Sequence, residues 1–103
     1  MEPLIRPDDI PYLPRGVRLQ EDRVRGIRVL QAPERAMQLD AIGDAILSEL
    51  DGQRSMSAIA NDLAARYNAP PEQIAGDIHD FLTGLIERRM VFLKPLQASA
   101  EGR

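Results

Sequence analysis

The chain has 103 residues, 44% of them apolar and 28% charged, with a net charge of −3, which is typical of one small globular domain. The negative charge argues against a polyanionic partner such as nucleic acid, and no apolar run approaches the ~20 residues that a membrane-spanning helix requires. Cysteine is absent, which excludes disulfides, thiolate nucleophiles and cysteine-ligated iron–sulfur clusters.

Further signals of catalysis or targeting are missing from the sequence. The single histidine, His79, cannot by itself make a zinc site, which needs three or four protein ligands. No glycine-rich phosphate loop occurs, and the N-terminus lacks the basic start and apolar block of a signal peptide. We therefore expect a cytoplasmic protein that is not an enzyme, with no catalytic residues, no metal, no cofactor and no membrane partner.

The first part of the chain predicts an extended arm followed by a hairpin. Four prolines fall within residues 1–16, so this arm should be extended and lie over the domain. Val17 and Leu19 then alternate with polar residues, and Ile27 and Val29 repeat the pattern after a polar turn. This alternation predicts two antiparallel strands with one buried face.

A third strand is predicted from Arg35 to Leu39, after a break at Pro33. Met37 and Leu39 should point inward, and the residues between them should point outward. Three strands joined by short turns make an antiparallel meander, in which the third strand is a free edge unless another segment covers it.

Three helices are predicted after the strands, over residues 41–50, 56–67 and 71–88. Asp40 and Ser55 are suitable N-caps, Gly52 and Asn68 suit the ends of the first two helices, and Pro71 suits the first turn of the third. Helical spacing predicts inward positions at Ile42, Ile46, Leu47, Leu50, Ile59, Ala60, Leu63, Tyr67, Ile74, Ile78, Phe81, Leu82, Leu85 and Ile86.

These elements predict an α+β fold, a small winged-helix-like domain in which a three-stranded antiparallel sheet precedes a three-helix bundle. Met90 to Leu93 is either a short final strand or an apolar tail folded on the core. We expect a proline-rich arm over 1–16, a folded domain over 17–93 and a flexible tail over 94–103.

Two chemical interpretations receive little support from the residues. A DNA-reading helix should be basic, whereas the third helix carries four acidic residues against Arg88 and the adjoining Arg89. Asp77 and Asp80 share a helix face, but nothing in the sequence supplies a partner for acid–base chemistry, and solvated surface explains them better.

The predicted edge strand is the more informative candidate. Its unpaired N–H and C=O groups offer a place for an extended peptide, although the arm or a second copy of the chain would cover the same edge equally well. Gly84, inside the third helix, lets a peptide approach, reflects close helix packing, or is a tolerated substitution with no role.

Several stretches, in this order and spacing, resemble the PqqD family of pyrroloquinoline quinone (PQQ) biosynthesis. They are "APER" with "LD" shortly after it, "ILSELDG", "LAARYNAP" and "DIHDFLTGLIERRMV", and the resemblance covers about Pro11 to Leu93. Many members of the family have glycine where this chain has Arg89 or Met90. The resemblance implies a peptide chaperone that binds the precursor peptide PqqA and presents it to the radical-SAM enzyme PqqE.

The resemblance also implies a binding site, in which the leader peptide is added as a strand beside the third strand and against the third helix. Matched onto this chain, the peptide-binding residues are Arg35, Ala36, Met37, Gln38, Leu39, Asp77, Ile78, Phe81, Leu85 and Arg88. A winged-helix DNA-binding protein and a small homodimeric scaffold protein stay open as alternatives.

Overall fold

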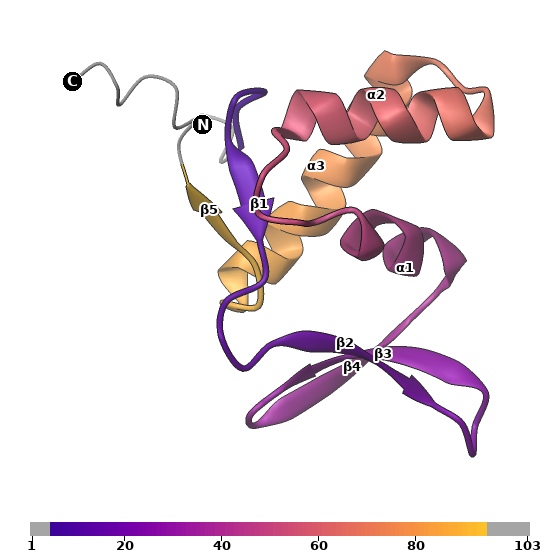
Figure 1. Ribbon diagram of the computed structural model, residues 1–103, viewed down its shortest axis with the longest axis vertical. Helices are drawn as coiled ribbons and strands as arrows, with labels where there is room; N and C mark the ends of the chain where they lie inside the picture. Colours follow the sequence, from indigo (N-terminus) through magenta and orange to yellow (C-terminus); the bar gives the residue numbers. More distant parts are fainter. Residues whose placement is uncertain (1–4, 95–103) are drawn as a thin grey trace.

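A computed structural model describes residues 5–94 and places a three-stranded sheet beneath three helices (Figure 1). A separate pair of short strands joins the two ends of the described chain. In chain order the elements are β1 (Ile10–Tyr12), β2 (Arg18–Asp22), β3 (Ile27–Ala32), β4 (Arg35–Leu39), α1 (Ala41–Ser48), α2 (Met56–Tyr67), α3 (Pro71–Glu87) and β5 (Phe92–Lys94).

The sheet is antiparallel in the order β2-β3-β4, so β4 is an edge strand, as predicted. Leu30 in the central strand lies opposite Leu19 and Met37, and this row faces the helices, with Leu30 fully buried. In β4, Leu39 is buried and Met37 half-buried, whereas the other three residues are exposed, as the alternation predicted.

The side-chain phase predicted for β3 is wrong. Val29 lies opposite Gln20 and Gln38, so Val29 and Ile27 point to the outer face, and Leu30 takes the inward position. Because side chains alternate with a period of two, a one-residue difference in register exchanges the two faces. Each phase of this strand carries two apolar residues and one polar residue, so alternation alone could not choose between them.

The N-terminal arm packs against the helices. Ile5 and Ile10 are buried, and β1 pairs antiparallel with β5. Of the last apolar segment, Phe92 and Leu93 lie in this strand, whereas Met90 and Val91 are buried in the core before it. The backbone N–H groups of Met56 and Ser57 donate to the carbonyls of Asp9 and Pro7, at 2.8 and 3.0 Å. The arm thereby satisfies helix-terminal donors that have no partner within α2.

The boundary predicted between residues 16 and 17 stays a prediction. Residues 1–4 of the predicted arm and residues 95–103 of the predicted tail lie outside the described part of the chain.

The predicted helix starts are confirmed. Asp40 Oδ1 accepts the N–H of Gly43 at 2.7 Å, and Ser55 Oγ accepts the N–H of Ala58 at 3.2 Å. Pro71 occupies the first turn of α3, where its missing N–H costs no hydrogen bond.

The ends of α2 and α3 use left-handed residues, Asn68 at φ +54° and Arg89 at φ +62°. After Arg89, the N–H of Met90 donates to the carbonyl of Leu85 at 2.9 Å, and both side chains are buried. This is a Schellman ending, in which the left-handed position favours glycine.

Three details of the first two helices differ from the prediction. α1 ends at Ser48 with Glu49 as its cap, and Gly52 (φ +74°) lies in the following loop. Ile42 and Tyr67, expected inward, are 66% and 55% exposed. Periodicity identifies an apolar helix face, but a neighbouring element must cover that face before it is buried.

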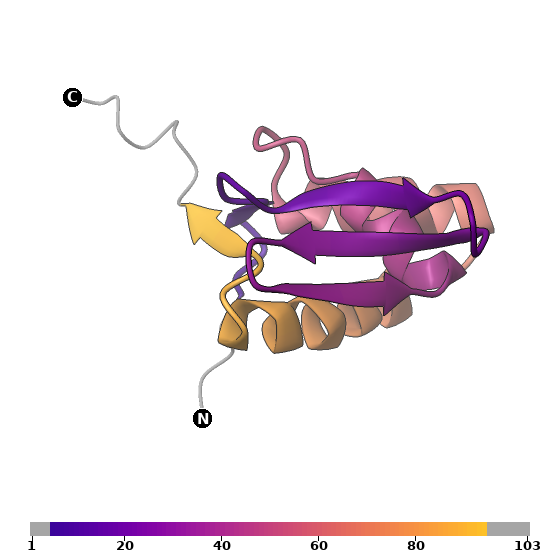
Figure 2. The same ribbon diagram turned by 90° about the horizontal axis from the view of Figure 1, so that it is seen from below.

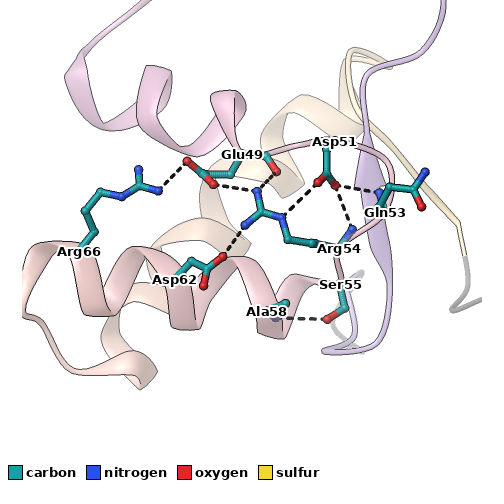
Figure 3. Close-up of polar contacts among 8 residues, drawn as sticks. All are labelled: Glu49, Asp51, Gln53, Arg54, Ser55, Ala58, Asp62 and Arg66. Atoms are coloured by element: carbon teal, nitrogen blue, oxygen red, sulfur yellow. Dashed lines mark hydrogen bonds and ion pairs between the residues drawn. The ribbon is translucent and has the colours of Figure 1, made fainter.

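Arg54 ties the end of α1 to α2 (Figure 3). Its guanidinium pairs with Glu49 at 2.7 Å, donates to the Glu49 carbonyl at 2.8 Å, and also pairs with Asp62. Arg66 pairs with the second oxygen of the Glu49 carboxylate at 2.9 Å. Hydrogen bonds from Arg54 and Arg66 lower the pKa of Glu49 below its ordinary value.

Candidate functional site

The free edge of β4 presents backbone groups in register. Ala32 of β3 and Arg35 of β4 flank a two-residue loop, so they form a hydrogen-bonded pair. The N–H and C=O groups of each therefore point toward the other strand. Alternation then turns the N–H and C=O groups of Ala36 and Gln38 toward the free edge, while those of Met37 face β3. Because no further strand of residues 5–94 pairs with this edge, it offers four backbone groups to an extended segment.

An apolar aromatic residue lies beside this edge. Phe81 of α3 joins Met37, Gln38, Leu39 and Asp40 in lining a depression of about 310 Å³. In Figure 2, which views the sheet from below, α3 runs along the β4 side of the sheet. Because the edge and the depression are adjacent, an extended chain paired with β4 can place an apolar side chain against Phe81. We call this combined surface the β4–α3 groove.

Gly43 determines where the Phe81 ring lies. A Cβ atom at Gly43 would be 3.0 Å from Phe81 Cζ and 3.2 Å from Asp40 Oδ1, closer than side chains normally approach. The absence of that Cβ lets the ring rest against the first turn of α1, next to the capping carboxylate. Sequence reasoning missed Gly43, although a glycine inside a helix costs about 1 kcal/mol relative to alanine and was a usable signal.

The residues matched from the family divide into groove and core. Met37, Gln38, Leu39 and Phe81 line the groove, and Arg35, Ala36 and Asp77 are exposed near it. Ile78 and Leu85 are each 1% exposed, so they support α3 from within the core. Arg88 caps α3, and its Nη1 donates to the carbonyl of Gly84 at 3.2 Å.

Gly84 does not mediate close helix packing. A Cβ atom at this position would meet Arg88 Nη1 at 3.4 Å and no other atom within 4 Å in the described part of the chain. Of the three explanations drawn from the sequence, the one that invokes tightly packed helices is wrong; peptide approach and a tolerated substitution both stay open.

The chemistry of the groove suits binding. Its walls combine backbone groups of the β4 edge with apolar side chains, and the acidic residue Asp40 also lines it. Within residues 5–94, no three potential metal ligands from His, Asp or Glu gather in one place, and no helix is long and apolar enough to cross a bilayer.

Comparison with known proteins places the sequence among relatives. A family model described as coenzyme PQQ synthesis protein D (PqqD) matches residues 28–91. The PqqA binding protein of Rhizobium meliloti is 49% identical over 89 residues, which cover 86% of this chain and 91% of that protein. The bifunctional coenzyme PQQ synthesis protein C/D of Methylorubrum extorquens is 46% identical over 83 residues, which cover 81% of this chain and 22% of the relative.

Two solved structures are also similar. The NMR structure of the PqqD truncation of Methylobacterium extorquens PqqCD, described as a stand-alone RiPP recognition element, is 42% identical with a TM-score of 0.76 and covers 87% of this chain and 96% of its own. The crystal structure of PqqD from Xanthomonas campestris is 41% identical with a TM-score of 0.53, and the match covers 76% and 87%.

These matches confirm the resemblance drawn from the sequence and the α+β fold class. The relatives are named as binding proteins and as a recognition element, which confirms the prediction that the chain is not an enzyme.

Proposed function

The chain belongs to the PqqD family, and on this premise we propose that it is a non-catalytic chaperone in PQQ biosynthesis that binds the precursor peptide PqqA. The peptide adds as a strand to β4 and places apolar side chains in the β4–α3 groove. The single observation that carries this proposal is the unpaired β4 edge lying directly beside Phe81.

The free energies involved show that PqqA binding needs both the strand edge and the apolar side chains of the groove. Four backbone hydrogen bonds contribute about 2–6 kcal/mol in total, at ~0.5–1.5 kcal/mol each. Association costs ~4–15 kcal/mol in lost freedom, so the strand alone does not hold a peptide. One or two buried apolar side chains add ~1.5–3 kcal/mol each and bring micromolar binding within reach.

We further propose that the bound PqqA is presented to the radical-SAM enzyme PqqE in the cytoplasm. Support comes from the relative in which a matching segment is part of a bifunctional PQQ synthesis protein C/D, since it shows such a domain joined to another part of a PQQ synthesis protein. A bound strand at the β4 edge keeps its outer side open to a second protein, because β4 pairs with β3 on the other side.

Titration with synthetic PqqA, followed by backbone NMR and calorimetry, tests the proposal. We expect the largest amide shifts at Ala36, Gln38 and the groove-facing part of α3, with micromolar or tighter binding. Shifts confined to β2 and the β2–β3 turn would contradict docking at β4.

The same experiment separates the alternatives. Duplex DNA at two salt concentrations is the counter-titration, because phosphate contacts make DNA binding strongly salt-dependent. A salt-dependent DNA response without a PqqA response would favour the winged-helix DNA-binding alternative. Sedimentation of the free chain tests the homodimeric scaffold alternative.

A further inference from the structure

A second depression lies among the three helices. It has a volume of about 290 Å³, and its walls come from the start of α1, the end of α2 and the first half of α3. Except for Asp77, the lining side chains are apolar or aromatic, among them Ile42, Ile46, Leu63, Tyr67 and Ile74. We call it the three-helix pocket.

The rim of this pocket is unusually apolar for surface. Ile42 and Tyr67, at 66% and 55% exposure, are two of the four large apolar residues that the described chain exposes to this degree. The other two, Val24 and Phe92, lie on separate elements, the β2–β3 turn and β5. Two exposed apolar residues that converge on one concave surface mark a binding site more strongly than scattered ones do.

The three-helix pocket continues the β4–α3 groove. On α3, Asp77 lines the pocket one turn before Phe81, which lines the groove. On the other wall, Asp40 borders the groove and Ile42, two residues later, borders the pocket. A chain that leaves the groove past Leu39 therefore reaches the pocket next, past the exposed carboxylates of Asp40 and Asp77.

We propose that the three-helix pocket binds a bulky apolar side chain of the same peptide, from the residues just N-terminal to the segment paired with β4. The inference rests on the proposed function. The direction follows from the sheet, in which every pairing is antiparallel. An antiparallel partner of β4 begins beside Leu39, so its preceding residues extend toward Ile42 and Tyr67.

Size and polarity define the side chain. An engineered apolar cavity of ~150 Å³ binds benzene, so a pocket of about 290 Å³ accommodates a leucine, isoleucine or phenylalanine side chain with room for part of its neighbour. A charged side chain is disfavoured because the walls are apolar except for the Asp77 carboxylate and the Tyr67 hydroxyl. Recognition is thus bipartite, with a strand in the groove and one apolar anchor outside it.

The test compares Ile42→Asn with Val24→Asn, two neutral changes at exposed apolar residues, by titration with synthetic PqqA. Ile42→Asn should weaken binding about tenfold, because a polar group then faces the apolar anchor, whereas Val24→Asn should change affinity less than about twofold. Ala45→Phe, which fills the pocket while keeping it apolar, should also weaken binding. Circular dichroism confirms that each variant is folded.

NMR identifies the occupant directly. We expect nuclear Overhauser effects between the Ile42 methyl groups and an apolar side chain of PqqA that precedes the paired segment. If the wild type binds PqqA with shifts at β4, but Ile42→Asn and Ala45→Phe bind as well as the Val24→Asn control, the pocket inference is overturned and the proposed function stands. If the wild type does not bind PqqA, both fail. If Ile42→Asn instead abolishes self-association seen by sedimentation, the occupant is a second copy and the inference is wrong.

Discussion

The sheet has two edge strands, β2 and β4, and they differ in what lies beside them. β4 borders the aromatic ring of Phe81 and the first turn of α1, which Gly43 allows to approach that ring. The depression that β2 borders is lined mainly by polar and charged side chains, among them Gln20, Glu21, Asp22, Arg23 and Arg25. In the part of the chain that the structure describes, no further strand pairs with either edge.

The difference shows that an open edge is not sufficient for a docking site. Backbone groups repeat identically along any strand, so they supply part of the affinity but little choice of partner. Apolar anchors beside the strand supply the rest of the free energy and the selectivity. Substitutions at the apolar anchor, at the edge strand and in the helices that pack behind it should therefore have successively smaller effects on binding or stability.

Removing the anchor should have the largest effect. Phe81→Ala should weaken PqqA binding by about 10- to 100-fold, because a buried apolar contact of ~1.5–3 kcal/mol is lost. Calorimetric titration measures the change. The matched control is Phe92→Ala, since Phe92 is a half-exposed aromatic on β5 that packs edge-on against Tyr12, away from the groove. Equal losses in both variants would show that the effect is general destabilisation.

Removing one edge donor should have a smaller effect. Gln38→Pro deletes an N–H that faces the free edge, so the domain should stay folded while PqqA affinity falls about 3- to 10-fold. Glu21→Pro is the matched change on β2, because alternation from the same register places its N–H on the opposite edge, and it should leave affinity unchanged. Met37→Pro should unfold the sheet, because its N–H faces β3.

If Gln38→Pro and Glu21→Pro weaken PqqA binding equally, β4 is not the preferred edge for the peptide. Normal binding by a folded Gln38→Pro variant would show that the peptide does not pair with that residue of β4.

Relieving backbone strain at the end of α3 should stabilise the helix that borders β4. Arg89 has φ +62°, a conformation that is unfavourable by about 1 kcal/mol for a residue with a Cβ atom. Arg89→Gly should therefore raise the free energy of unfolding by about that amount in urea titrations. Arg89→Ala keeps the strain and removes the charge. If Arg89→Ala stabilises the protein as much as Arg89→Gly does, the loss of the charge, and not the relief of strain, explains the effect.

Acid should weaken the helical layer behind β4 through Glu49. Its pKa in the folded chain lies below the ordinary value of 4.5, mainly because Arg54 and Arg66 donate hydrogen bonds to it. The resulting stability is fully present above the ordinary pKa and is lost as pH falls through the lowered pKa. The unfolding free energies of the wild type and Glu49→Gln should therefore differ most above the ordinary pKa of glutamate and become equal in acid.

Glu34→Gln is the control for this pH series, because Glu34 makes no ion pair with any residue in the described chain. A wild-type advantage over Glu49→Gln that stays constant into acid would contradict the role assigned to the Glu49 carboxylate.

Local physics made much of the fold predictable. Asp40, Ser55, Asn68 and Pro71 set helix boundaries through backbone hydrogen bonds and φ preferences that depend on neighbouring residues alone. The bounds and facing of β4 also followed from alternation, because polar and apolar residues alternate cleanly there. Within the candidate site, the sequence identified both β4 and Phe81, and the structure then showed that they line the same depression.

Tertiary packing decided the rest. The register of β3 depended on which of its two phases met the helices, and the exposure of Ile42 and Tyr67 depended on no element covering them within residues 5–94. The contact between Gly43 and Phe81 joins residues 38 positions apart, which no local pattern encodes. Sequence by itself thus determined the three helices, the three strands of the sheet and its open edge. Only the packed structure paired β1 with β5 and turned the open edge into a groove, because the partners in both cases come from distant parts of the chain.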